Sequence, residues 1–284
     1  MELIDLHVHS TASDGSLTPT ELVDLALQIG LKAVGITDHD TVGGLQEAIS
    51  RGKELDFEVV PGIEISADFK PGTMHMLGYF IDPCHPALLA KLTKLQEARR
   101  NRNPKIVAKL NNLGFDISME EIEAVAGGDQ IGRPHFAKVM LDKGYVTKFH
   151  EAFDLYLAKG APAYVDKFRF SPVEAMEAIY EAGGLPVLAH PFTLGLDKPE
   201  VLEALISDLV KKGLAGLEVY YSEHTPEMSQ AFLALVEKYN LCPTGGSDFH
   251  GLNKTQIELG RGMGDLAVPY AWLSSLRERW TNKA

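Results

Sequence analysis

The sequence predicts an α/β fold in which strands and helices alternate along most of the chain. Short apolar runs alternate with amphipathic segments, which is typical of an α/β barrel or a layered sheet. Proline next to serine or threonine marks several helix starts, and histidines and carboxylates recur where strands should end. At 284 residues, the chain is long enough for one large domain, or for one domain that carries an insertion.

Seven apolar runs are predicted to be strands. They cover residues 3–9, 32–37, 57–66, 74–81, 185–190, 216–221 and 241–245. Helices are expected between most of them, because Thr18-Pro19 and Ser171-Pro172 open capping boxes with proline at the first helical position. Gly30 stands where the first of these helices should end.

The connection between the third and fourth predicted strands is short. Only residues 67–73 separate them, and a parallel crossover needs roughly a dozen residues or more, so the two strands should pair antiparallel. Such a hairpin brings Glu64, near the end of one strand, and His75, near the start of the next, to the same end of the sheet. In barrels and open α/β sheets, catalytic sites gather at the end where the parallel strands finish.

The strand pattern stops between residues 86 and 164. Apolar residues at helical spacing from Leu88 to Leu113 predict helix, within which Asn103-Pro104 is either a helix start or a kink. We therefore interpret residues 100–165 as a helical insertion that contributes to substrate binding. Residues 1–99 and 166–284 are then the barrel that carries the site.

Composition narrows the range of partners. The net charge of −12 argues against binding to long nucleic acid or to an anionic membrane, although bound divalent cations would still admit a small anionic substrate. Cys84 and Cys242 provide neither a disulfide framework nor a C-x-x-C zinc pattern. We find no signal peptide and no apolar run of about 18–20 residues, which predicts a cytoplasmic protein without a membrane span. The oligomeric state is left open.

Imidazoles and carboxylates follow nearly every predicted strand. His7 and His9 lie on the same face of the first strand, about 7 Å apart, and could bind one metal ion. Nitrogen and oxygen ligands without thiolate favour Mn, Fe or Zn ions and argue against a structural zinc site. The nine predicted ligands are His7, His9, Asp14, His39, Glu64, His75, His190, Asp248 and His250.

Counting ligands divides these nine residues into three groups. They are His7, His9, Glu64 and Asp248; Glu64, His75 and His190, with Glu64 bridging; and Asp14, His39 and His250. Asp38 and Asp40, on either side of His39, are expected to support ligands rather than to bind metal.

In order and spacing, these residues resemble the PHP (polymerase and histidinol phosphatase) domain. The matching pieces are His7-Val8-His9, Thr37-Asp38-His39, Glu64, His75, Ala189-His190-Pro191 and Ser247-Asp248-Phe249-His250. The resemblance implies a distorted (β/α)7 barrel whose two or three divalent ions, most readily Mn²⁺, cleave phosphoester bonds. It also implies that a metal-bound hydroxide attacks phosphorus, with His39, Asp14 and Arg133 assisting.

Within that family, the helical insertion and the motif Gly132-Arg133-Pro134-His135 look like one branch. This branch contains nucleoside 3′,5′-bisphosphate phosphatases and 5′→3′ exonucleases that act on short RNA or DNA. The expected reaction is hydrolysis of a 3′,5′-bisphosphate nucleotide to the 5′-monophosphate and inorganic phosphate. The candidate substrate-binding residues are Arg102, Asn103, Lys105, Arg133, His135 and His224.

Four other functions are alternatives to a bisphosphate phosphatase. An exonuclease on short oligonucleotides would use the same site. Histidinol-phosphate phosphatase is disfavoured by the basic cluster in the insertion, because that substrate carries one phosphate and a positive amine. A non-catalytic metal-binding accessory domain is disfavoured because all nine ligand positions are filled and no polymerase is attached. An amidohydrolase that cleaves C–N bonds is disfavoured by the arginines and lysines suited to phosphate.

Overall fold

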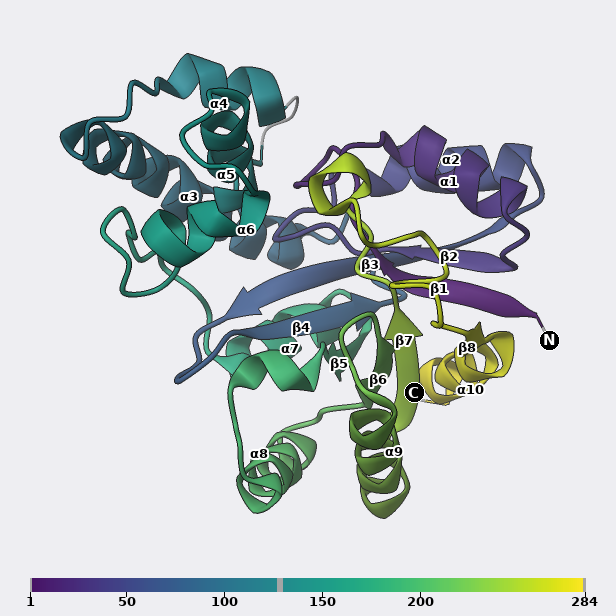
Figure 1. Cartoon of the computed structure of the whole chain (residues 1–284). Coiled ribbons are helices and arrows are strands. Elements are labelled where there is room, and N and C mark those ends of the chain that lie inside the picture. Colours follow the sequence, from purple (N-terminus) through teal and green to yellow (C-terminus); the bar gives the residue numbers. More distant parts are fainter. Residues whose placement is uncertain (1, 127–129, 283–284) are drawn as a thin grey trace.

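A computed structural model describes residues 2–126 and 130–282. Within these residues, eight strands form one sheet in the order β7-β6-β5-β4-β3-β2-β1-β8 (Figure 1). The strands are β1 (Leu3–Val8), β2 (Ala33–Ile36), β3 (Glu58–Ala67), β4 (Met74–Tyr79), β5 (Leu185–Leu188), β6 (Gly216–Tyr221), β7 (Cys242–Gly246) and β8 (Val268–Pro269).

The sheet curls into a nearly closed barrel, which confirms the predicted fold class. Strands β1 to β3 and β5 to β7 run parallel, whereas β4 is antiparallel to both of its neighbours. The barrel closes beside β7, where the main-chain N–H of His9 donates to the oxygen of Phe249 and the N–H of Asp248 donates to the oxygen of His7. The short strand β8, which pairs with β1, was not predicted, because two residues carry no periodicity.

The predicted hairpin is confirmed. In the β3–β4 pair, Ser66 lies opposite His75 and Glu64 lies opposite Leu77. Because β4 starts where β3 ends, Glu64 and His75 lie at the same end of the barrel. This reversal is what allows residues on β3 and β4 to share one site.

Ten α-helices of the described chain surround this sheet. They are α1 (Pro19–Gln28), α2 (Leu45–Glu54), α3 (Pro86–Asn112), α4 (Met119–Ala126), α5 (Arg133–Asp142), α6 (Phe149–Ala152), α7 (Pro172–Glu181), α8 (Pro199–Lys211), α9 (Pro226–Tyr239) and α10 (Tyr270–Thr281). Short π or 3-10 turns are η1 (Phe153–Leu157), η2 (Pro191–Leu194) and η3 (Gly251–Lys254). Thr18 and Ser171 form the predicted capping boxes. In the described part of the chain, no helix is long and apolar enough to cross a bilayer.

Helix α3 connects two separate apolar cores. Leu88, Leu92 and Leu95 in its first half pack with the barrel, whereas Ile106 and Leu110 in its second half pack with α4 to α6. Figure 1 shows α4 to α6 gathered to one side of the sheet, away from α8 and α9. The division at residues 99/100 and 165/166 stays a prediction, because α3 runs through the first boundary unbroken, with Pro104 inside it.

Candidate metal centre and cationic cavity

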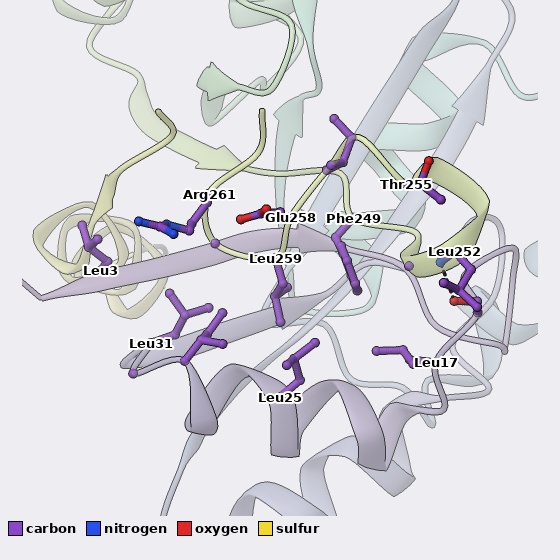
Figure 2. Close-up of a pocket in the computed structure, with 16 residues that line it drawn as sticks. Leu3, Leu17, Leu25, Leu31, Phe249, Leu252, Thr255, Glu258, Leu259 and Arg261 are labelled. Carbon is purple, nitrogen blue, oxygen red and sulfur yellow. Dashed lines mark hydrogen bonds between the residues drawn. The ribbon is translucent and has the colours of Figure 1, made fainter. Parts of the chain in front are cut away.

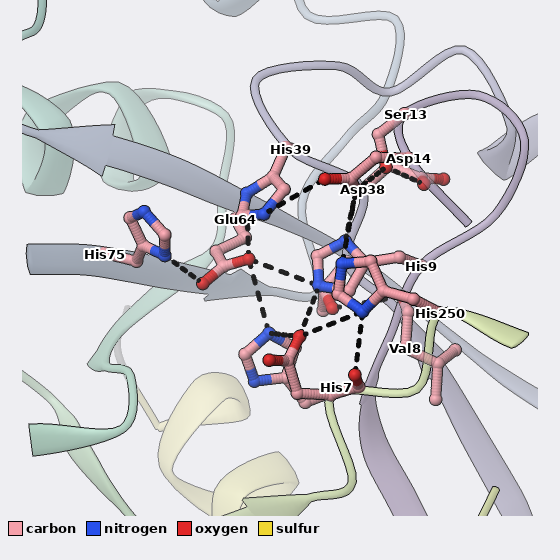
Figure 3. A network of polar contacts seen from close by, with 12 residues as sticks. His7, Val8, His9, Ser13, Asp14, Asp38, His39, Glu64, His75 and His250 are labelled. Atoms are coloured by element: carbon pink, nitrogen blue, oxygen red, sulfur yellow. Dashed lines mark hydrogen bonds and ion pairs between the residues drawn. The ribbon is translucent and has the colours of Figure 1, made fainter. Parts of the chain in front are cut away.

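The nine predicted ligands meet at one end of the barrel, and Figure 3 shows most of them turned toward a common centre. Three lie within strands: His7 in β1, Glu64 in β3 and His75 in β4. The other six follow strand ends: His9 and Asp14 after β1, His39 after β2, His190 after β5, and Asp248 and His250 after β7. The fold therefore gathers residues that lie up to 243 positions apart, from His7 to His250.

Three groups of ligand atoms, each within 4.8 Å of one another, form in the described chain. They are His7, His9, Glu64 and Asp248; His9, Asp14, His39 and His250; and His39, Glu64 and His75. The first group is the one that ligand counting predicted. The second gains His9, and in the third His39 stands where His190 was predicted. His190 still borders the centre, because its Nε2 lies 3.0 Å from Glu64 Oε1.

The donor set fits divalent cations. Several nitrogen and oxygen atoms at the centre are buried and lack a hydrogen-bond partner in the described structure: His7 Nε2, both ring nitrogens of His9, His39 Nδ1 and Glu64 Oε2. His7, His9 and Glu64 are fully buried. Buried polar atoms without partners are costly, and a cation shared among them would satisfy these atoms together. The residues present therefore match a bound metal in number, type and direction.

Protonation states at the centre favour metal binding for most ligands. Burial alone would raise the pKa of Glu64, but positive charge on neighbouring histidines, His39 first, holds it well below its usual value. Burial lowers the pKa of His75 to about 4, and burial together with the charge of Lys254 lowers the pKa of His250 to about 4. His75 and His250 are therefore neutral imidazoles at neutral pH, the form that binds metal. By contrast, neighbouring carboxylates, Asp248 and Glu64 among them, outweigh burial and raise the pKa of His9 to about 9 and that of His7 above its usual value, so a metal ion must displace protons there.

Two side chains that could not be identified from the sequence donate hydrogen bonds to Asp248. Its Oδ2 accepts hydrogen bonds from Tyr221 Oη at 2.9 Å and from Lys254 Nζ at 2.6 Å. Its Oδ1 is left to face His9 Nε2 at 3.0 Å. Nothing in the spacing of Tyr221 or Lys254 along the chain signals this contact, because β6 and η3 meet at Asp248 only in the folded barrel.

A cationic cavity of about 330 Å³ opens beside the centre. Its lining includes Arg99, Arg102, Arg133, Lys167 and Arg169, together with the metal-centre residues Asp14, His39 and His75. Several of these cations are buried, so their charges are poorly screened by water. The cavity is therefore suited to an anion next to the candidate metal centre.

Burial and neighbouring positive charges lower the pKa values of two of these cations. Burial, with the charge of Arg99 next, lowers the pKa of Arg102 to about 9. Burial and Arg99 also lower the pKa of Lys167 to about 7, although Lys167 Nζ lies 3.0 Å from Asp40. Arg102 donates to the neutral oxygen of Asn103, and no carboxylate of the described residues forms an ion pair with it. The positive charge of Arg102 is thus available to a ligand.

The predicted substrate residues of the insertion divide into two sets. Arg102 and Arg133 line the cavity, and Asn103 holds the Arg102 guanidinium in place while donating to the oxygen of Ile131. Lys105 is exposed and absent from the lining of this cavity, and Arg102 and Asn103 lie on the buried face of α3. His135 is buried and its Nδ1 accepts from the N–H of Gly132, so this nitrogen serves the start of α5.

His224 also lies apart from the cavity. Its Nδ1 bonds the oxygen of Val219, and its ring lines a separate pocket with Tyr220 and Tyr221. Sequence reasoning instead missed Lys167 and Arg169, which follow the insertion and enter the cavity. A short basic-aromatic run at residues 167–170 was the available signal.

The Asp40 side chain connects two cations of the cavity with strand β3. Its Oδ2 accepts from Arg99 and Lys167, and its Oδ1 accepts from the N–H of Ser66 on β3. Charges of Lys167 and Arg99 outweigh burial and hold the pKa of Asp40 well below its usual value. The arginine, the lysine and the His39 loop are thereby fixed relative to one another.

A larger pocket lies elsewhere and has a different character. It measures about 810 Å³ and lies between α1 and residues 249–261, as Figure 2 shows. Its lining is mostly leucine and other apolar side chains, with Glu258 and Arg261 as its ionisable groups. It contains none of the nine predicted ligands, so size alone does not locate the chemistry in this protein.

Comparisons with known proteins agree with this geometry. A family model described as the PHP domain matches residues 5–168. A 3′,5′-nucleoside bisphosphate phosphatase of Chromobacterium violaceum is 35% identical over 264 residues, which are 92% of this chain and 91% of that protein. A 5′-3′ exoribonuclease of Haemophilus influenzae is 34% identical over 259 residues, 91% of this chain and 93% of that one.

A solved structure extends the likeness to three dimensions. An amidohydrolase from Chromobacterium violaceum, with bound sulfate and no metal, has a TM-score of 0.86 at 32% identity and covers 97% of this chain and 96% of its own. The matched family region holds six of the nine predicted ligands, from His7 to His75, and the barrel brings the other three to them. With this fold, this ligand set and these full-length relatives, the chain belongs to the PHP domain family and is a metal-dependent phosphoric ester hydrolase.

Proposed function

We propose that the protein removes phosphate from a nucleotide that carries a second phosphate, most readily a 3′,5′-bisphosphate, and leaves the 5′-monophosphate. This proposal rests on three residues that belong both to the candidate metal centre and to the lining of the cationic cavity. Asp14, His39 and His75 belong to the metal groups and also line the cationic cavity. A substrate with one phosphate at the metals can therefore place a second anion among the arginines.

Different residues of the chain would bind the metal ions, the phosphoryl group and the second phosphate. Divalent ions, when bound, would supply an activated water and neutralise phosphoryl oxygens. The nine predicted ligands would hold them, with His39 and Asp14 at the border of the cavity. Arg133 opens α5 and is kept in place by its bond to the oxygen of Leu157, so its charge can stabilise the phosphoryl oxygens. Arg102 and Lys167 would bind the second phosphate.

The names of the relatives support the same substrate class. The Chromobacterium phosphatase is named for a nucleoside bisphosphate, and the solved amidohydrolase holds sulfate, an anion shaped like phosphate. Histidinol phosphate fits the cavity poorly, because its amine would meet the arginines. The non-catalytic reading is set aside, since this chain belongs to a family of phosphoric ester hydrolases and matches named phosphatases over most of its length.

A 5′→3′ exonuclease on short RNA or DNA is the second candidate. It is favoured by the Haemophilus relative and by the aromatic rings of Phe69, Phe153 and Tyr164, which line the cavity. Aromatic faces of this kind bind bases by stacking, whatever the base. Long nucleic acid is not expected in either case, because the chain carries a net charge of −12.

Phosphate release from a substrate panel distinguishes these candidates. We expect turnover of 3′,5′-bisphosphate nucleotides with a higher kcat/KM than that of mononucleotides, because only the former reach both the metals and the cavity. The panel contains nucleoside 3′- and 5′-monophosphates, a 3′,5′-bisphosphate, histidinol phosphate and 5′-phosphorylated short oligonucleotides. Preferred release of 5′-nucleotides from the oligonucleotides would assign the exonuclease, and preference for histidinol phosphate would contradict both.

Metal content is the second expected result. We propose that the purified protein carries two or three divalent ions per chain, most readily Mn²⁺, with Fe or Zn as alternatives, because three groups of ligand atoms form. Elemental analysis measures the stoichiometry, and addition of Mn²⁺ to the metal-free protein should raise its melting temperature, since the ion binds only the folded state. Fewer than one ion per chain, without activation by added Mn²⁺, would contradict the proposal.

The cytoplasm stays the predicted compartment. Cys84 is exposed and Cys242 is buried, and neither forms a disulfide. Free thiols of this kind are usual in a reducing compartment.

A further inference from the structure

Strand β6 differs from its neighbours in the barrel. Among β1 to β7, it is the strand that supplies no predicted metal ligand, either in the strand or directly after it. Two of its side chains nevertheless bind predicted ligands: Tyr221 contacts Asp248, and Glu218 contacts both His7 and His190. Glu218 is fully buried, and sequence reasoning assigned it nothing.

The contact with His7 determines which ring nitrogen is free. Glu218 Oε1 lies 2.9 Å from His7 Nδ1. A carboxylate oxygen accepts, so Nδ1 carries the proton in this contact, and in the neutral imidazole that binds metal the lone pair then lies on Nε2. Nε2 is the His7 atom that is buried without a hydrogen-bond partner, and it faces Glu64 Oε2 at 3.3 Å.

The second oxygen of Glu218 acts on the backbone of His190. Oε2 accepts from the N–H of His190 at 2.7 Å. His190 adopts φ 24° and ψ 70°, in a region that side-chain-bearing residues rarely occupy. The bond to Glu218 holds this backbone while the His190 ring reaches Glu64 Oε1 at 3.0 Å. One carboxylate thus links a ligand on β1 to another after β5.

We infer that Glu218 is a positioning residue, which fixes the tautomer and ring direction of His7 and the backbone of His190 so that both can bind metal. The inference rests on the proposal that His7 and His190 are metal ligands. Buried carboxylates that accept from the remote nitrogen of a metal-binding histidine are a recurrent means of orienting the ring.

The test is Mn²⁺ binding by the variant Glu218→Gln. Its amide has nearly the same shape but presents N–H where one oxygen accepted, so either His7 must shift its proton to Nε2 or the His190 bond must break. We expect Mn²⁺ affinity to fall by about 10–100-fold, measured by titrating the metal-free protein while free Mn²⁺ is followed by electron paramagnetic resonance. Tyr79→Phe is the matched control, because it removes a buried hydroxyl that donates to the oxygen of Leu6 in the same barrel. Its affinity should be unchanged.

A measurement on the unaltered protein covers the case in which Glu218→Gln fails to fold. Long-range ¹H–¹⁵N spectra of the Zn²⁺-loaded protein should show the His7 proton on Nδ1. A proton on Nε2, or an unchanged Mn²⁺ affinity in folded Glu218→Gln, would overturn the positioning role and leave the metal centre standing. Failure of the unaltered protein to bind Mn²⁺ would instead contradict the metal centre itself.

Discussion

Glu64→Gln is expected to lower kcat by roughly 10³ or more while the protein stays folded. Among the carboxylates of residues 2–126 and 130–282, Glu64 is the one with contacts to five of the predicted ligands. Its Oε1 lies 2.7 Å from His75 and 3.0 Å from His190, and its Oε2 lies 2.9 Å from His39 and 3.3 Å from both His7 and His9. An amide keeps the shape of the side chain but loses the charge and one of the two donor oxygens, so ions shared through Glu64 should be lost or displaced.

The matched control is Glu58→Gln, which makes the same change at the other end of the same strand. Glu58 accepts from Tyr270 and Arg277 and touches none of the predicted ligands. Steady-state kinetics and elemental analysis of both variants measure the effect, and circular dichroism checks the fold. Normal turnover and full metal content in Glu64→Gln would show that the carboxylate is structural. Equal losses in both variants would indicate damage to the barrel rather than to the centre.

Arg102→Met is expected to lower kcat/KM for a 3′,5′-bisphosphate by ~10–150-fold, which corresponds to the loss of one charge-assisted contact worth about 1.5–3 kcal/mol. The loss should largely spare a monophosphate, which never makes that contact. Methionine keeps much of the buried volume of Arg102. The fold should tolerate the change, because it removes one of several cations crowded into the cavity.

Lys105→Met controls for a change of charge on the same helix. Lys105 is exposed and lies outside the cavity lining, so both substrates should be turned over at the normal rate. Equal losses on the two substrates in Arg102→Met would mean that Arg102 serves the scissile phosphate or the fold. No loss on either substrate would mean that Arg102 binds no substrate phosphate.

Local rules account for the parts of the fold that could be predicted. Thr18 and Ser171 mark helix starts because their side chains satisfy N–H groups of the first helical turn, and this bond depends on the next three residues. The β3–β4 hairpin follows from the length of the connecting loop alone, since residues 67–73 are too few for a crossover between parallel strands. Strand β8 and the unbroken run of α3 through Pro104 depend instead on packing against distant segments.

Alternation, helix caps and strand-end positions are local features, so the sequence by itself predicted an α/β fold, the insertion as a region of helix, and a set of nine candidate imidazoles and carboxylates. The choice of a barrel over a layered sheet came from the resemblance to the PHP domain. Only the tertiary structure decided how these ligands group, with His9 and His39 each shared between two groups. It also decided that Lys167 enters the cavity while Lys105 faces solvent, and that Glu218 and Lys254 hold the ligands. The physical reason is that carboxylates and ammonium groups form hydrogen bonds and ion pairs only within a few ångströms. The folded barrel determines which residues far apart in the sequence come that close.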